Sequence, residues 1–551
     1  MTAVPFPAET RERAFPVLDA SQLERFEPHG KRRSVEKDEV LVEAGQQHFH
    51  FYAVLSGRLE AMQTGGGEEH LIASLERGQF TGEHSLVAGR RALSTIRATE
   101  PSEVIEIERE ALLALIQTDA ELSEILMRAF ILRRVELIAH GFGDVIVLSS
   151  PYCADTLRVK EFLTRNGHPF TSIDLDRDAG VQDILDRFHI NEEDVPVVIW
   201  RGSKVLRNPS NEEIADALGL NETIDDTRIR DVLIIGAGPA GLAAAVYAAS
   251  EGLDTLVIES NAPGRQAGSS SRIENYLGFP TGISGQELAG RAFTQAEKFG
   301  AQVMIAKSAA RLRCDEQPYA VEIENGQRIP ARTIIIATGA KYRELQVANL
   351  ARYQNFGIYH GATHLEAQVC RDEEVIVVGG GNSAGQAAVF LAETAKKVHV
   401  LVRSNGLSES MSRYLIRRIE THPKIELHTE TEIEALEGDE FLERVRWKTK
   451  GRPSETHDIR HIFVMTGAEP CTSWLEGCLA LDGHGFVRTG PDLEPLDLVN
   501  WSRQRSPYLL ETSIPGVFAV GDVRCGNIKR VASAVGEGAI AIAFVHQVLR
   551  A

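Results

Sequence analysis

The sequence predicts a multidomain protein: an N-terminal β-barrel with a C-terminal helix, then a small α/β domain, then two nested α/β nucleotide-binding domains. Three observations predict this fold class. The chain of 551 residues is long enough for three or four domains. Residues 15–98 carry short β-rich runs separated by glycine-containing turns. Two glycine-rich turns, near residues 236 and 379, each join an apolar strand to a helix.

The overall composition is that of an ordinary globular protein, with 43% apolar and 25% charged residues. The formal net charge of −19 argues against nucleic acid and anionic membrane as partners. No apolar run approaches the ~20 residues of a membrane span, and the N-terminus lacks the basic start and apolar run of a signal peptide. We therefore expect a cytoplasmic protein.

The cysteines are spread along the chain without a CxxC pair. They are Cys153, Cys314, Cys370, Cys471, Cys478 and Cys525. This spacing argues against a disulfide scaffold and against a CxxC zinc site, so each thiol has to be considered alone. We predict no metal site.

Residues 15–140 form the first predicted domain. Strand-like runs end near Ala98, and from Arg109 to His140 apolar residues recur every three or four positions, as in a helix. With the Phe51 to Gly57 motif FYAVLSG and the pair Gly82-Glu83, this region resembles a cyclic-nucleotide-binding domain.

The arginine that would bind a cyclic phosphate is displaced in this sequence. In the family that it resembles, an arginine just before the next strand pairs with the cyclic phosphate. Here that position falls on Ala92, with Arg91 one residue early, and a shift of one residue on an extended segment points a side chain to the opposite face. We therefore favour ligand-free docking or dimerisation over cyclic-nucleotide binding.

Residues 144–220 form the second predicted domain, after a joint at Gly141-Phe142-Gly143. A strand over Val145 to Leu148, a helix over Leu157 to Arg165, a strand over Phe170 to Leu175, a helix to about Phe188 and a strand opening with Val195-Pro196 follow one another. This order resembles a glutaredoxin or thioredoxin-like domain, in which the proline is cis and lies beside the reactive thiol.

Cys153 is the candidate redox residue of this domain. It lies where a helix begins, and the helix dipole can lower the pKa of a thiol there. Thr156 stands where a dithiol protein has its second cysteine, so Cys153 can form only a mixed disulfide. Asp155 opposes thiolate formation. Redox use of Cys153 and a retained docking module are both open.

Residues 228–343 and 468–551 form the third predicted domain. Its strand from Val232 to Ile235 leads into Gly236-x-Gly238-x-x-Gly241 and an alanine-rich helix. Such glycines allow a pyrophosphate to sit on the helix N-terminus, and Glu259, at the end of the next strand, suits an adenosine ribose hydroxyl. We expect a bound dinucleotide here.

The C-terminal segment returns to this domain. The strand Gly516 to Val520 ends near Asp522, and a last helix starts at Val531. An aspartate at a strand end can accept a bond from a ribityl hydroxyl, and the helix N-terminus can face a flavin pyrimidine.

Residues 344–467 form the fourth predicted domain, a second dinucleotide unit. Gly379, Gly381 and Ser383 lie in its glycine-rich turn, and its second strand ends on Arg403. A base in the position of the usual acid accommodates a 2′-phosphate, so we favour NADPH over NADH.

Two nested units, with ATGA at 337–340 and GVFAVGD at 516–522, resemble the low-molecular-weight thioredoxin reductases over residues 228–551. The resemblance implies an NADPH-dependent flavoprotein, a homodimer and two lobes that rotate to alternate their contacts with the flavin. It also implies the following contacts: FAD at Gly236, Gly238, Gly241, Glu259, Gln266, Asn275, Asp522, Arg530, Val531 and Ala534, and NADPH at Gly379, Gly381, Ser383 and Arg403.

The chain departs from that family at the redox-active disulfide. Counted back from Gly379, the two cysteine positions fall on Ala362 and Leu365, which cannot carry electrons. Cys370 lies nearby at a strand entry and is expected to be packed. Cys525, three residues after Asp522, is expected to be an ordinary loop cysteine.

Three functions remain open. The first is an NADPH-dependent reductase of the thioredoxin reductase type whose electrons leave through Cys153 to a small-molecule or protein thiol acceptor. The second is a CxxC-less flavin reductase that acts directly on ferredoxin, quinone or oxygen. The third is a redox or nucleotide sensor with little turnover.

Overall fold

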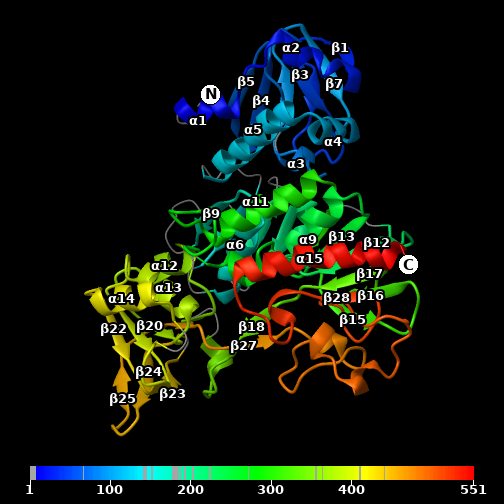
Figure 1. Cartoon of the computed structure of the whole chain (residues 1–551). Helices are drawn as coiled ribbons and strands as arrows, with labels where there is room; N and C mark the ends of the chain where they lie inside the picture. The colour runs from blue at the N-terminus through cyan, green and yellow to red at the C-terminus, as the bar shows by residue number, and fades with distance from the viewer. Residues whose placement is uncertain are drawn as a thin grey trace.

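The computed structural model describes most of the chain in four successive units (Figure 1). The described residues are 8–65, 68–82, 84–87, 89–139, 145–150, 153–175, 185, 188–191, 194–200, 204–221, 225–270, 272–353, 357–362, 364–408, 411–439 and 441–550. Four expected features lie outside them: Glu83, the joint Gly141-Phe142-Gly143, the end of the first long helix at His140, and most of the helix before Phe188.

The N-terminal unit is built from two facing sheets, with strand orders β1-β7-β3 and β2-β6-β4-β5. Phe51 and Phe80 lie between the sheets with ring centroids 5.6 Å apart, and Phe130 of the last helix packs edge-on against Phe80 at 6.2 Å. Its elements are α1 (Ala8–Ala14), α2 (Ala20–Glu24), η1 (Glu27–His29), β1 (Lys31–Val35), β2 (Val40–Val42), β3 (Phe51–Ser56), β4 (Leu59–Gly65), β5 (Glu68–Leu75), α3 (His84–Val87), β6 (Thr95–Ala98), β7 (Ser102–Ile107), α4 (Arg109–Thr118) and α5 (Ala120–Ala139).

The helical stretch that starts at Arg109 is two helices rather than one. Asp119 has extended backbone angles between α4 and α5, and its carboxylate accepts a hydrogen bond from the Leu122 amide at 3.0 Å. The same carboxylate pairs with Arg25. An aspartate that caps a helix and has its own ion pair stabilises the break, which apolar periodicity does not reveal.

The second unit has a four-stranded sheet in the order β11-β10-β8-β9, with α6 packed on it. β8 pairs parallel with β9 and antiparallel with β10. The Val195-Pro196 bond that precedes β10 is cis, as expected. Its elements are β8 (Val145–Ser149), α6 (Ala154–Arg165), β9 (Thr171–Asp174), β10 (Val197–Trp200), β11 (Lys204–Arg207) and α8 (Asn211–Leu218).

The third unit, the first lobe, has a sheet in the order β14-β13-β12-β17-β16-β15, to which the late strand β28 adds by pairing parallel with β17. The C-terminal segment therefore completes a sheet that starts almost 290 residues earlier, between Arg230 and Ala519. Its elements are β12 (Arg230–Ile235), α9 (Pro239–Ser250), β13 (Thr255–Glu259), α10 (Arg265–Gly268), α11 (Gly285–Lys298), β14 (Gln302–Ile305), β15 (Ala309–Arg313), β16 (Tyr319–Ile323), β17 (Arg328–Ile336), η4 (Ser473–Leu475), η5 (Gly490–Asp492), η6 (Pro495–Leu498), β28 (Val517–Ala519), η7 (Gly521–Val523) and α15 (Val531–Arg550).

Helix α15 is long and apolar enough to cross a membrane, by length and composition alone. Within the described chain no other helix meets that test. Its apolar residues have a different explanation, because α15 packs closely along α9. A Cβ atom at Gly538 would lie 2.2 Å from the carbonyl oxygen of Ala240, and Ala541, Ile542 and Val545 are fully buried. One face of α15 therefore packs into the core of the first lobe.

The second lobe is joined to the first by two antiparallel strands, β18 (Ala340–Tyr342) and β27 (Ala468–Pro470). Its parallel sheet has the order β19-β26-β20-β21-β22, and a small antiparallel sheet, β23-β24-β25, lies beside it. Its elements are η3 (Leu350–Tyr353), β19 (Ile358–Tyr359), α12 (His364–Val369), β20 (Glu374–Val378), α13 (Asn382–Leu391), β21 (Lys397–Leu401), α14 (Arg413–Thr421), β22 (Ile425–His428), β23 (Thr431–Glu437), β24 (Arg444–Thr449), β25 (Glu455–His457) and β26 (His461–Val464).

Two cysteines form a disulfide that the sequence analysis did not anticipate. Cys314, after β15, is bonded to Cys478, which is 164 residues later and follows η4. Sequence spacing contains no sign of this bond, because the two segments meet only when the chain returns to the first lobe. The assumption that each thiol stands alone is therefore wrong for these two residues.

Candidate cofactor and redox site

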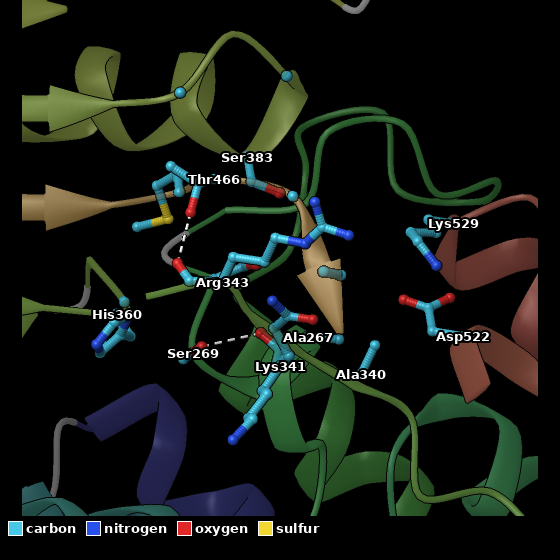
Figure 2. A pocket seen from close by; sticks show the side chains of 18 of the residues that line it. Ala267, Ser269, Ala340, Lys341, Arg343, His360, Ser383, Thr466, Asp522 and Lys529 are labelled. Atoms are coloured by element: carbon cyan, nitrogen blue, oxygen red, sulfur yellow. Dashed lines mark hydrogen bonds between the residues drawn. The ribbon is translucent and has the colours of Figure 1, made fainter. Parts of the chain in front are cut away.

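One large cavity, of about 1610 Å³, runs between the two lobes. It exceeds the roughly 300–1,000 Å³ of an ordinary ligand pocket. Both glycine-rich turns, both connecting strands and helix α6 of the second unit contribute to its wall. Figure 2 shows part of the wall, where side chains from both lobes approach the same space.

The first glycine-rich turn reaches this wall at Gly238, whereas Gly236 and Gly241 do not line the cavity. Gly236 has a φ of +107°, which favours glycine, and a Cβ at Gly241 would lie 1.8 Å from the Gly236 carbonyl oxygen. Gly238 is the N-cap of α9 and has no capping side chain. The first N–H groups of α9 are thus left for a ligand, at the positive end of the helix dipole.

Glu259 has a different environment from the predicted one. It is fully buried and does not line the cavity. One carboxylate oxygen accepts a hydrogen bond from the Ala237 amide and the other from the Asn261 amide, both at 2.8 Å. Arg265 also pairs with it, at 3.3 Å. Glu259 therefore stabilises the glycine-rich turn from within the fold and not from the cavity.

The remaining candidate residues of the first lobe line the cavity. They are Gln266, Asn275, Asp522, Arg530, Val531 and Ala534. Burial raises the pKa of Asp522 from its ordinary value of 3.8, although Lys529 opposes that shift. Figure 2 places Asp522 and Lys529 on the same side of the cavity.

The second glycine-rich turn repeats the geometry of the first. Gly379 has a φ of +142°, and a Cβ there would lie 2.4 Å from the Met465 carbonyl oxygen. Gly381, the N-cap of α13, has no capping side chain, and Ser383 follows it on the cavity wall. The first turn of α13 thus offers a second set of N–H donors.

Arg403 follows β21, the second strand of this dinucleotide unit. It is exposed and lines the cavity. Among the described residues, no acid forms an ion pair with its guanidinium. A guanidinium in the same lobe as the open N-terminus of α13, on the wall of the same cavity, makes this lobe suitable for phosphate groups.

The position of the expected dithiol carries no thiol. Ala362 is buried, and its backbone forms a bridge with Ser270 of the first lobe. The side chain of Leu365 lies outside the described part. Cys370 is fully buried, and burial raises its pKa to about 12, so it is packed as expected. Cys525 does not line the cavity.

Helix α6 brings the second unit to the cavity. Leu157, Glu161 and Arg165 follow one another at four-residue spacing along α6, and all three line the cavity. Leu157 also packs against the apolar cluster of the second lobe that contains Ala362. Arg165 donates a hydrogen bond of 2.6 Å to the Arg265 carbonyl of the first lobe.

Cys153 lies at the start of this helix, one turn before Leu157. It is the N-cap of α6 and is half-buried. Its thiol lies 3.5 Å from the Val195 carbonyl, next to the cis proline, and donates to it. The Asp155 carboxylate pairs with Arg158 at 2.8 Å, which lowers the pKa of that carboxyl. The Arg158 charge offsets part of the repulsion that Asp155 exerts on a thiolate.

The N-terminal unit contacts the other units through the segment around Ala92, the position at which a cyclic-nucleotide-binding domain has its phosphate-binding arginine. Arg90 reaches Glu297 of α11 at 3.5 Å, and the Arg91 guanidinium lies 5.2 Å from the Trp200 ring of the second unit. Ala92, in the position of the family's arginine, is buried. Both arginines are therefore engaged between units.

Sequence reasoning missed several cavity residues. Lys341 and Arg343, on and after β18, and His360, after β19, line the cavity (Figure 2). Burial lowers the pKa of His360, so its imidazole is neutral at neutral pH. No local motif marks these residues; Lys341 and Arg343 reach the site through β18, which pairs with β27 between the lobes, and His360 reaches it at the end of β19.

Three family models match the chain. The model "Pyridine nucleotide-disulphide oxidoreductase" matches residues 230–538, more than half of the chain. The models "Cyclic nucleotide-binding domain" and "Glutaredoxin" match residues 32–119 and 145–205. The N-terminal part therefore carries both of these domains.

Relatives point the same way. The thioredoxin reductase of Mycolicibacterium smegmatis is 32% identical over 315 residues, which are 57% of this chain and 94% of that protein. That of Mycoplasmopsis pulmonis is 28% identical over 319 residues, 58% and 97% of the two chains. The crystal structure of Lactococcus lactis thioredoxin reductase superposes with a TM-score of 0.52 at 28% identity, covering 58% of this chain and all of that one.

Proposed function

Because the chain belongs to the pyridine nucleotide-disulphide oxidoreductase family and is of the thioredoxin reductase type, we propose a specific route for its electrons. They pass from NADPH through FAD to a thiol/disulfide acceptor by way of Cys153. The observation that carries the proposal is that α6, which starts at Cys153, forms a wall of the cavity shared by both glycine-rich turns.

The first lobe has the features that FAD requires. The open N-terminus of α9 suits the pyrophosphate, and Asp522 can accept a bond from a ribityl hydroxyl. Gln266, Asn275 and the Arg530 to Ala534 segment line the adjoining wall. A bound flavin would supply two-electron chemistry between a hydride donor and a disulfide.

The second lobe has the features that NADPH requires. The open N-terminus of α13 suits its pyrophosphate, and the exposed Arg403 suits a 2′-phosphate better than a ribose hydroxyl. Without a competing ion pair among the described residues, the Arg403 guanidinium is available for that role. We therefore propose NADPH, and not NADH, as the donor.

The electrons need an exit that Ala362 and Leu365 cannot provide. Of the described free thiols, Cys471 lines the cavity itself, and Cys153 is the one that belongs to the fused domain, one helical turn before the cavity-lining Leu157. In a mixed disulfide of Cys153 with a thiol R–SH, two electrons break the S–S bond. With two protons, one brought with the hydride and one from solvent, the products are Cys153–SH and R–SH.

Covalent fusion favours this exit. A tethered domain holds its thiol at an effective concentration of about millimolar, so it need not compete with a diffusing partner. The Leu157 contact and the Arg165 hydrogen bond anchor α6 at both of its ends. A rotation of the lobes or of the fused domain brings the thiol and the flavin together.

A second function remains a candidate because Ala362 leaves no thiol at the family position. In that function the reduced flavin passes electrons directly to ferredoxin, quinone or oxygen, and Cys153 is a bystander. In a third, the protein senses redox state and turns over little.

Anaerobic rapid mixing with NADPH, followed by an acceptor screen of the wild type and Cys153→Ser, separates these functions. We expect rapid bleaching of the flavin in both proteins and turnover with a low-molecular-weight disulfide in the wild type alone. Turnover that is indifferent to Cys153→Ser would support the second function, and bleaching without turnover the third. Protein that stays colourless when offered FAD would contradict all of them.

Further properties belong to the same proposal. We propose a cytoplasmic homodimer with domains at 15–140, 144–220, 228–343 with 468–551, and 344–467. We also propose that the N-terminal domain docks without a cyclic nucleotide, supported by the engagement of Arg90 and Arg91 between units. Calorimetric titration with cyclic AMP and cyclic GMP tests this point, and micromolar binding would contradict it.

A further inference from the structure

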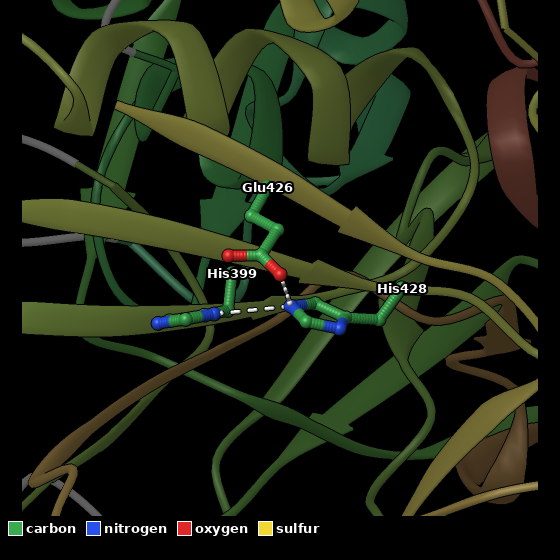
Figure 3. Close-up of side chains that lie close together, drawn as sticks. All are labelled: His399, Glu426 and His428. Atoms are coloured by element: carbon green, nitrogen blue, oxygen red, sulfur yellow. Dashed lines mark hydrogen bonds and ion pairs between the residues drawn. The ribbon is translucent and has the colours of Figure 1, made fainter. Parts of the chain in front are cut away.

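Three metal-ligating side chains lie together at the edge of the second lobe, away from the cavity. His399 is on β21, and Glu426 and His428 are on the neighbouring strand β22 (Figure 3). The ligand atoms of all three lie within 4.8 Å of one another. None of the three lines the cavity, so the cluster is not part of the cofactor site.

Strand geometry brings them together. β21 and β22 pair in parallel, with His399 opposite Glu426 and Leu401 opposite His428. Residues two apart on a strand share a face, so Glu426 and His428 flank the His399 side chain. His399 is a polar residue between the valines of β21, KVHVL. The parallel pairing therefore places three potential metal ligands together.

The distances fit a common cation. The His399 Nδ1 and His428 Nε2 atoms are 3.0 Å apart, and the nearer Glu426 oxygen is 3.7 Å from His428 Nε2. Two imidazole nitrogens bound at 2.0–2.1 Å to a tetrahedral Zn²⁺ would be roughly 3.3 Å apart. A shift of a few tenths of an ångström would therefore open the pair to an ion.

An outer carboxylate orients the buried imidazole. His399 Nε2 lies 3.3 Å from a Glu374 oxygen, which leaves its Nδ1 lone pair directed at His428. Metal-bound histidines usually donate their other N–H to a carboxylate in this way. One carboxylate oxygen of Glu374 pairs with Lys396, and one of Glu426 pairs with Lys397. The other oxygen of each carboxylate faces the histidines.

The aromatic ring of Trp447 covers one side of the cluster. The Trp447 ring, which is buried, lies 5.5 Å from the His399 ring and 5.2 Å from the His428 ring. His457 stacks on the other part of Trp447, at 3.6 Å between centroids. The ligands are therefore shielded on one side, while Glu426 is exposed and gives an ion access from solvent.

We propose that His399, Glu426 and His428 bind one divalent transition-metal ion, with water completing its coordination. Two imidazoles and one carboxylate suit Zn²⁺, Ni²⁺ or Cu²⁺ better than Mg²⁺ or Ca²⁺, which prefer oxygen ligands. The ion fastens the edge strand β22 to β21. Its role is structural, because the site has no contact with the cavity.

Titration of the chelator-treated, full-length protein with Zn²⁺ and with Co²⁺ tests this site. We expect one saturable equivalent, a rise in the unfolding temperature, and a Co²⁺ absorption spectrum without thiolate charge-transfer bands. Glu374→Gln should weaken the affinity about 10-fold through lost orientation of His399, and His428→Gln should abolish saturable binding.

His422→Gln, which removes a half-buried histidine of the same lobe, is the matched control and should bind as the wild type does. Glu426→Gln changes an exposed side chain, so it tests the site even if His428→Gln does not fold. Wild-type binding that is absent, that shows thiolate bands, or that survives both His428→Gln and Glu426→Gln would overturn the proposal.

Discussion

The former dithiol position of the reductase part and the thiol position of the glutaredoxin-like domain differ in almost every respect. Ala362 is buried and is tied to the first lobe by a backbone bridge to Ser270. Cys153 is half-buried at a helix N-terminus beside a cis proline. The first position has no thiol and is closely packed, while the second has one free thiol.

One contact links the fused domain to the lobe that contains Ala362. Leu157, one helical turn after Cys153, packs against the apolar cluster that contains Ala362. The fused domain therefore contacts the lobe in which Ala362 lies. If Cys153 is the electron exit that we propose, the redox thiol lies in a different domain from the family's dithiol, and that domain contributes to the same cavity.

The largest expected effect comes from breaking that contact. Leu157→Asp would place a carboxylate against an apolar cluster, which is costly. We expect disulfide-dependent turnover to fall roughly 30-fold, held above zero by the tether, while flavin reduction by NADPH stays within about twofold. Parallel rapid-mixing and steady-state assays check this. Leu157→Met is the control, and equal loss in both variants would contradict the docking role.

Arg403→Ala tests whether thiol turnover depends on NADPH bound at the second lobe. Arg403→Ala deletes a charge-assisted contact worth about 1.5–3 kcal/mol, so we expect KM for NADPH to rise roughly 10-fold or more. KM for NADH should hardly change, and thiol turnover should follow flavin reduction. An equal change for both nucleotides would assign Arg403 a merely structural role.

Asp522 offers a smaller effect with a defined pH dependence. Burial raises its folded-state pKa above 3.8, so the folded protein holds this proton more tightly than the unfolded chain does. Its contribution to the free energy of unfolding therefore falls as pH rises from 3.8 through the folded-state pKa. Asp522→Asn escapes this penalty.

FAD-free Asp522→Asn should thus unfold at a higher temperature than the wild type at pH 8, with the difference vanishing in acid. Its affinity for FAD should fall about 10-fold, because an acceptor for a ribityl hydroxyl is weakened. Thermal scans across pH and flavin titration measure the two effects. A wild type that is more stable than the variant at pH 8 would contradict the assignment.

The smallest effect is expected at the other thiol position. Ala362→Ser adds one hydroxyl to a buried site and should cost about 1–3 kcal/mol of stability at most. Thiol-dependent turnover should stay within about twofold of the wild type. A large loss of turnover in a folded Ala362→Ser protein would show that this position still takes part in the reaction.

The sequence predicted what local patterns encode and missed what depends on distant segments. Gly238 and Gly381 were found because each lies in a glycine-rich turn between an apolar strand and a helix, and Cys153 because it lies where a helix begins. Lys341 and Arg343 reach the cavity through the pairing of β18 with β27, and Cys314 meets Cys478 across 164 residues. No local pattern contains those encounters.

Glu259 teaches a related lesson. An acid at that spacing predicts a ribose contact, and the structure adds a role that the spacing does not reveal: one oxygen accepts a backbone hydrogen bond from Ala237 in the turn and the other from Asn261 after β13. The placement of α6 along the cavity was likewise hidden, since Leu157, Glu161 and Arg165 look like an ordinary helix face. Such contacts depend on how whole domains pack together.

The central claim is that Cys153 receives electrons from the flavin, and single-turnover reduction of a labelled thiol tests it directly. Cys471→Ser/Cys525→Ser protein, in which Cys153 carries thionitrobenzoate as a mixed disulfide, is mixed anaerobically with one equivalent of NADPH. We predict release of one yellow thionitrobenzoate anion per NADPH, at a rate independent of protein concentration. A flavin that is reduced while the label stays on Cys153 would contradict the account.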